Sequence, residues 1–156
     1  MNSKKIILLN FKETRRRSIN LWNEIPLEYL NWKPDQKAFT CIEMVRHVLE
    51  AEHLFHTVIN NRGNLGTYIS PWKNLEYINV THELKFAENY RNDFFSMIEY
   101  LNELDLEKIT INRTEVNQHK KLGDYLNRMV YHEAVHTGQL LSYLRTLGIK
   151  RPQIWD

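Results

Sequence analysis

The chain has 156 residues, enough for a sizeable core, and we expect residues 1–156 to form a single domain. It contains only 5 glycines and 4 prolines, which argues against a turn-rich β-sandwich or barrel and favours long helices. The 21 Lys and Arg residues nearly balance the 19 Asp and Glu residues, so charge gives no reason to expect a nucleic-acid partner.

Neither a disulfide nor a membrane segment is expected. The single Cys41 cannot form an internal disulfide and is compatible with a reducing cytosol. The apolar run at residues 6–9 is too short for a signal-peptide core, and no run approaches the roughly 20 apolar residues of a membrane-spanning helix. We therefore expect a cytoplasmic protein without a membrane partner.

Two helices are predicted in the first half of the chain. Apolar residues at steps of three and four predict a first helix over residues 4–24, which Pro26 ends. The three consecutive arginines at 15–17 are expected on its solvated face. A second helix begins near Thr40, because Thr40 and Glu43 form a Thr-x-x-Glu capping box, and it ends by residues 60–63. The next residues, to about 80, are expected to form a long loop that packs back on the body.

Two more helices are predicted in the second half. The third is capped by Thr81 and has the clearest apolar stripe in the chain, formed by Phe86, Tyr90, Phe94, Met97, Leu101 and Leu104. Residues 106–120 lack this period, although 109–111 could pair as a short strand. A fourth helix runs from Leu122 to its left-handed cap at Gly148. This pattern predicts an all-α four-helix bundle, with long connectors between helices two and three and between helices three and four.

Two of the seven histidines share one face of the fourth helix. His132 and His136 lie about 40° apart in projection, so both imidazoles can reach one point beside the bundle interior. A shared cation would remove the cost of desolvating such a pair. His47, at an edge of the second helix, could supply a third ligand, although its position alone also suits an ordinary hydrogen-bonded histidine.

The other four histidines are not expected to bind metal. His53 and His56 project roughly 240° and 180° from His47, so they are expected to face solvent. His82 lies at a helix start and His119 in a loop, and both are expected to be ordinary surface residues.

The string from His132 to His136 also matches the His-Glu-x-x-His pattern of zinc proteases. Such proteases usually take a third ligand from downstream, and the only acid there is Asp156 at the terminus. Glu133 projects about 100° from His132, away from the metal point. A protease is therefore not expected.

Residues 132–148, which read HEAVHTGQLLSYLRTLG, resemble the final helix of DinB/YfiT-like proteins, in which two histidines precede a Gly-Gln pair and a Tyr-Leu-Arg-x-x-Gly ending. Trp32-Lys33-Pro34 and the segment MVRHVLEAE at 44–52 are similar to the Trp-x-Pro turn and the helix-two histidine of that family. Order and spacing agree over essentially the whole chain. Thr137 departs from the arginine common at its place, which puts a substrate-binding role of that position in doubt.

The resemblance implies a bundle in which His47, His132 and His136 bind a divalent metal, often as a homodimer. Relatives include thiol-dependent S-transferases and an isomerase that use low-molecular-weight thiols, and others are described only as metal-dependent hydrolases. The resemblance thus implies a small-molecule substrate and a transferase or hydrolase activity. The alternative is a non-catalytic bundle whose metal or apolar face serves dimerisation or partner binding.

Three neutral imidazoles would leave open positions on the metal, as in catalytic rather than structural sites. Zinc is the first expectation, with nickel, iron or manganese as alternatives. Four residues are candidates for supporting the ligands or lining the pocket: Gln139, Glu50, Tyr125 and Tyr143. Each could instead be ordinary packing at the rim, and no catalytic side chain is assigned.

Two further apolar features concern the surface. Tyr131, Val135 and Leu141 lie on the sides of the fourth helix away from its main stripe, which favours a C2 dimer. Residues 149–156 are expected to fold back on the bundle and cover Ile154 and Trp155.

Overall fold

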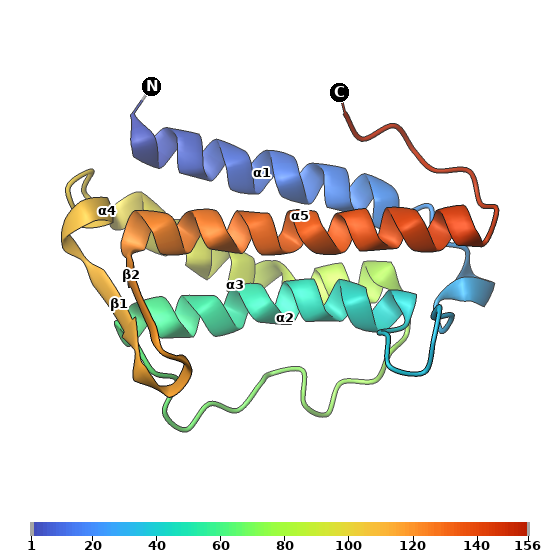
Figure 1. Cartoon of the computed structure of the whole chain (residues 1–156), viewed down its shortest axis with the longest axis horizontal. Helices are drawn as coiled ribbons and strands as arrows, with labels where there is room; N and C mark the ends of the chain where they lie inside the picture. Colours follow the sequence, from blue (N-terminus) through green and yellow to red (C-terminus); the bar gives the residue numbers. More distant parts are fainter. Residues whose placement is uncertain (1, 156) are drawn as a thin grey trace.

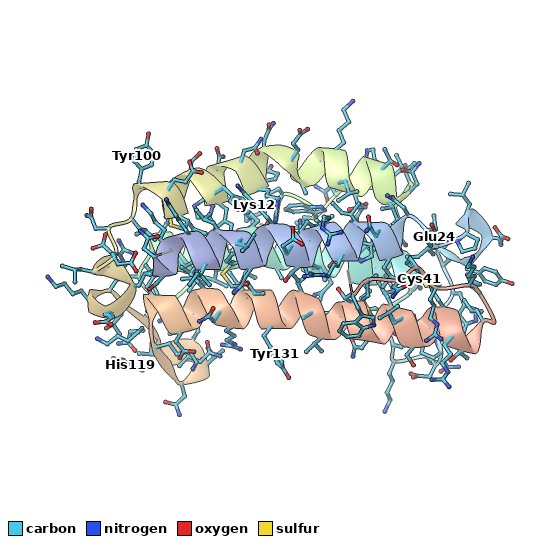
Figure 2. The ribbon with its side chains drawn as sticks, turned by 90° about the horizontal axis from the view of Figure 1, so that it is seen from above. Lys12, Glu24, Cys41, Tyr100, His119 and Tyr131 are labelled. Atoms are coloured by element: carbon cyan, nitrogen blue, oxygen red, sulfur yellow. The ribbon has the colours of Figure 1, made fainter. Side chains whose placement is uncertain are left out.

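A computed structural model describes residues 2–155, so Asp156 lies outside the described residues. Four long helices form most of it: α1 (Ser3–Trp22), α2 (Cys41–Asn60), α3 (Val80–Tyr100) and α5 (Leu122–Thr146). In Figure 1, α1 lies at the top and α2 at the bottom, with α5 in front and α3 behind. Viewed from above, α1 lies between α3 and α5 (Figure 2). Each helix thus packs against two others, and the chain is mostly helical.

The prediction of an all-α chain is wrong in one region. Between α3 and α5 lie α4 (Asp105–Lys108), β1 (Thr110–Arg113), the short 3-10 helix η2 (Thr114–Val116) and β2 (Gln118–Lys121). β1 and β2 pair as an antiparallel hairpin, in which Asn117 takes a left-handed conformation with φ of 51°. This segment lacks a helical apolar period, and within its two strands only Ile111 is buried, at 1% exposed. The suggestion of a short strand at 109–111 was close to the observed β1.

Local signals placed most helix ends correctly. Thr40 and Glu43 form the predicted capping box, and Gly148 has the predicted left-handed conformation, with φ of 70°. The cap of α3 is Asn79 rather than Thr81, because the Asn79 side chain accepts a hydrogen bond from the His82 backbone. Since α3 ends at Tyr100, Leu104 leaves the apolar stripe and is 60% exposed.

The two connecting segments near α2 pack on it. Pro26 is followed by the short 3-10 helix η1 (Leu27–Tyr29), and the long segment between α2 and α3 runs beneath α2 (Figure 1). Trp72 anchors this segment in the core, as the expected packing requires. At the C-terminus Ile154 is buried as predicted, but Trp155 is 84% exposed.

A buried ion network joins all four long helices. Arg15 of α1 donates to Glu133 of α5 and to Glu52 of α2, and Arg91 of α3 also pairs with Glu52. Arg15 is only 4% exposed, so the expectation of a solvated face was wrong for this arginine. Burial alone would lower the pKa of its guanidinium, but the carboxylates of Glu133 and Glu52 outweigh that effect and raise it.

No helix in the described part of the chain combines the length and the apolar character needed to cross a membrane. The three histidines that could hold a metal lie between helices, where α2 contacts α5.

Candidate metal centre

Three histidine side chains converge between α2 and α5. Nε2 of His132 lies 3.1 Å from Nε2 of His47 and 3.1 Å from Nε2 of His136. All three ligand atoms lie within 4.8 Å of one another, and all three side chains are half-buried. Their helical positions explain this: His132 and His136 stack on one face of α5, and α2 turns His47 toward them. The structure thus brings together the three histidines predicted from sequence.

Hydrogen bonds cannot satisfy this arrangement. A neutral imidazole Nε2 carries either one proton or one lone pair, so Nε2 of His132 cannot make full bonds to two other nitrogens. A zinc ion with Zn–N distances of about 2.0–2.1 Å would hold tetrahedral ligand nitrogens about 3.3–3.4 Å apart. The observed separations of 3.1 Å are close to that value. The donor set therefore fits a divalent metal better than it fits mutual hydrogen bonding.

Gln139 supports one of the candidate ligands. Its Oε1 lies 2.7 Å from Nδ1 of His136. An amide oxygen can only accept, so Nδ1 of His136 must carry the proton, which leaves the Nε2 lone pair directed at the cluster. Glu50 lies near His47, and its charge partly offsets the lowering of the His47 pKa. No described hydrogen bond joins Glu50 to that ring.

Burial favours the neutral form of the His132 and His47 imidazoles. It lowers the pKa of His132 to about 4, aided by the neighbouring His136 and His47. The pKa of His47 is also lowered, first by burial and then by His136. Neutral imidazole is the form that binds metal, so the site is prepared for a cation at neutral pH.

Aromatic rings flank the histidines on both sides. The Phe39 ring stacks on His47, with centroids 4.9 Å apart, and the Phe55 ring meets His132 edge-on at 5.7 Å. Sequence reasoning missed both, since neither is a metal-ligating residue type and Phe39 precedes α2. Tyr143 contributes indirectly, because its hydroxyl donates to the Phe39 carbonyl at 3.2 Å. Tyr125, expected at a pocket mouth, is instead buried against Phe55.

Glu133 points away from the histidines. Its carboxylate is buried against Arg15, with an Nε to Oε1 distance of 2.7 Å, and that guanidinium holds its pKa below the usual range despite burial. Thr137 faces α1 as well, and its hydroxyl lies 2.9 Å from that of Ser18. The zinc-protease interpretation of this string therefore lacks its general base, as the projection predicted.

The remaining histidines differ in part from expectation. His53 does not face solvent, because its Nδ1 lies 2.9 Å from the Tyr68 hydroxyl under the connecting segment. His56 is half-buried beside Phe94, and the His82 ring is half-buried with its Nδ1 fully buried. Only His119 is exposed as predicted. Cys41 is fully buried, and burial raises the pKa of its thiol to about 11, so it is no nucleophile.

Comparisons with known proteins identify a family and a shared fold. The family model described as DinB superfamily matches residues 10–140. The chain is 29% identical over 143 residues to the uncharacterized protein YjoA of Bacillus subtilis (strain 168), covering 91% of this chain and 89% of that one. The crystal structure of a DinB-like protein, YjoA, from Bacillus subtilis superposes with a TM-score of 0.71, at 24% identity and with 95% and 96% of the chains covered. At that identity the superposition shows the shared fold alone.

Proposed function

Since the chain belongs to the DinB superfamily, we propose that His47, His132 and His136 hold one divalent metal ion for chemistry on a small molecule. The proposal rests on the close approach of three Nε2 atoms that cannot all form hydrogen bonds with one another. Zinc is the first candidate, because three histidines with an open position are a common zinc donor set, and nickel, iron and manganese also accept imidazole.

Three protein ligands would leave at least one coordination position open. A metal held there supplies a Lewis acid that lowers the pKa of a coordinated water or thiol. Gln139 keeps His136 in the ligating tautomer, and Phe39 and Phe55 shield the flanks of the cluster from water. A thiol-dependent S-transferase or a hydrolase acting on a small molecule would use such an open metal position.

Metal analysis tests the ligand assignment. Purified protein incubated with zinc and then dialysed should retain about one equivalent, and His132→Ala should lose it. His119→Ala is the matched control, because His119 is exposed on the hairpin and should leave the metal content unchanged. Retention of metal by His132→Ala, or failure of the native chain to bind any divalent metal at micromolar concentration, would refute the assignment.

A screen of metal-dependent turnover tests the activity. Low-molecular-weight thiols combined with electrophiles test the transferase, and small esters and amides test the hydrolase.

The second candidate, a non-catalytic metal-binding module that serves dimerisation, is favoured by one surface observation. Tyr131 projects from α5 into solvent and is 71% exposed, with Val135 one turn further on (Figure 2). Metal bound tightly without turnover in the screen would favour that candidate.

We further propose a homodimer and a single four-helix-bundle domain in the cytoplasm. The contacts among the four long helices support the bundle, and the exposed Tyr131 and Val135 support a second copy against α5. Solution mass, measured for the native chain and for Tyr131→Glu, tests the dimer. A monomeric native chain would refute it.

A further inference from the structure

One arginine lies beside the histidine cluster without a described hydrogen bond at its buried end. Arg128 precedes His132 by one turn on the same face of α5, about 6 Å along the helix axis. Its Nη1 is buried and has no hydrogen-bond partner among the described residues. Burial and the neighbouring His136 and His47 lower the pKa of His132, and the positive charge of Arg128 adds a smaller contribution.

A second guanidinium approaches the same place from the hairpin. Arg113 ends β1 and belongs to the strand face that also buries Ile111. Tyr125, one turn before Arg128, links the two arginines. Burial raises the pKa of the Tyr125 phenol, and the neighbouring Arg113 and Arg128 partly offset that rise. Tyr125 also connects this group to the histidines, because Phe55 contacts both the Tyr125 ring and the His132 ring.

Unsatisfied polar atoms gather at this point. Among the described residues, buried side-chain atoms without a well-formed hydrogen bond include Nη1 of Arg128, the Tyr125 hydroxyl and Oε1 of Gln118. Gln118 is the register partner of Arg113 in the hairpin, so it belongs to the same group. Folded proteins pair nearly all buried polar atoms, and a guanidinium nitrogen is expensive to leave unpaired. Of these three atoms, Nη1 of Arg128 and the Tyr125 hydroxyl can donate, whereas Oε1 of Gln118 only accepts. The two donors fit a bound oxyanion.

The charges of the group select the kind of anion. Arg113 pairs with Glu115, at 2.6 Å, so the two arginines together carry one uncompensated positive charge. A carboxylate has one negative charge and two acceptor oxygens, so it balances this positive charge. A phosphate monoester would bring nearly two negative charges. The planar guanidinium also matches a carboxylate by a pair of parallel hydrogen bonds.

We propose that Arg128, with Arg113 and the Tyr125 hydroxyl, forms a subsite that binds the carboxylate of a small-molecule substrate whose reacting group lies at His47, His132 and His136. This assignment rests on the proposed metal-dependent function, and it defines the substrate as a compound that carries a carboxylate a few bonds from the group it presents to the metal. Arg128 is the specificity-determining residue of the subsite.

Two matched thiols test the subsite in zinc-loaded protein. 3-Mercaptopropionate and 3-mercapto-1-propanol have the same thiol and chain length and differ in the carboxylate. Calorimetry should show that the native chain binds the carboxylate about 10- to 100-fold more tightly, the range expected for hydrogen bonds to a charged group. Arg128→Gln should reduce this ratio to near one with little change for the alcohol, and Arg128→Lys should give an intermediate ratio. Arg145→Gln, an exposed arginine further along α5, is the matched control and should keep the native ratio.

A second arm uses metal-free protein, so that it still decides the proposal if no metal is taken up. Propionate should shift the arginine side-chain NMR signal that is missing in Arg128→Gln, and ethyl phosphate should bind more weakly. The proposal is overturned if the native chain binds both thiols equally or if Arg128→Gln keeps the native ratio. A preference for ethyl phosphate over propionate, or no response of the Arg128 signal to propionate, would also overturn it. Melting curves of both Arg128 variants verify that they are folded.

Discussion

Replacing Glu133 separates a structural role from a catalytic one. This carboxylate follows His132 in a His-Glu-x-x-His string, yet it is 4% exposed and bonded to Arg15 at 2.7 and 3.0 Å. Glu133→Gln removes one of the two negative charges that balance Arg15 and Arg91 in the buried network. Removing one partner of a buried ion pair costs about 3–5 kcal/mol, and since glutamine keeps one acceptor oxygen we expect about 3 kcal/mol. That is a large share of the 5–15 kcal/mol that typically separates folded from unfolded states.

A double variant isolates the electrostatic part of this cost. Arg15→Met combined with Glu133→Leu removes the pair together and leaves Glu52 and Arg91 as a balanced pair. Since replacing a whole buried pair with apolar side chains is often neutral, the double variant should cost well under the sum of the two single variants, with a coupling of about 2 kcal/mol or more.

Urea unfolding with the metal removed measures these costs. The midpoint should fall for Glu133→Gln, while the dependence of the free energy on urea stays the same, because the surface exposed on unfolding does not change. Zinc affinity should change less than threefold, because Glu133 does not contact the histidines and glutamine keeps one acceptor for Arg15, which preserves the rotation of α5. The reasoning is refuted if Glu133→Gln unfolds within 1 kcal/mol of the native chain while metal-dependent turnover, once identified, is abolished.

Three further variants and one change of pH have defined outcomes. Lowering the pH from about 6.5 toward 4 should destabilise the metal-free protein by about 1–2 kcal/mol. In this range the unfolded chain binds a proton at His132, whereas the folded chain, in which the pKa of His132 is about 4, binds it only at lower pH. Urea midpoints across this range measure the effect, and a flat profile would contradict it. Gly63→Ala should cost about 1–3 kcal/mol, because its methyl group would collide with a β1 backbone carbonyl. Gly138→Ala, where nothing lies within 4 Å, should instead stabilise α5 by roughly 0.5–1 kcal/mol, so equal melting temperatures of the two variants would contradict both. Gln139→Leu should weaken zinc binding about 10- to 100-fold through loss of its bond to His136, measured by competition with a chromophoric chelator, and native affinity would show that the bond does not orient the ring.

The features that local patterns predicted are those whose cause lies within one helix or one turn. The capping box at Thr40, the end of α5 at Gly148 and the shared face of His132 and His136 all depend on residues three to four apart. The contribution of His47 needed the family resemblance, because no local rule says which edge of α2 meets α5.

The features that sequence reasoning missed depend on partners far along the chain. Arg15 continues the spacing of Ile7 and Phe11 and so lies on the inner face of α1, but its partners are 37 and 118 residues away and no local pattern identifies them. His53 was assigned to solvent by its projection from His47, but the connecting segment returns over it and offers the Tyr68 hydroxyl. Arg128 gave no signal either, because an isolated arginine on a helix normally reaches water.

The buried network and the histidine cluster constrain the same rotation of α5. Consecutive residues on a helix diverge by about 100°, so fixing Glu133 against Arg15 also fixes the direction in which the neighbouring His132 points. Glu52 imposes the same constraint on α2, five residues after His47, because it pairs with arginines from α1 and α3. One charged residue from each long helix thus sets the angle at which the two halves of the candidate metal centre meet. A metal site of this precision tolerates errors of about 0.5 Å, and non-directional apolar packing alone would leave the rotation of a helix less defined. The four buried charges therefore orient the three imidazoles, by fixing the rotation of α2 and α5.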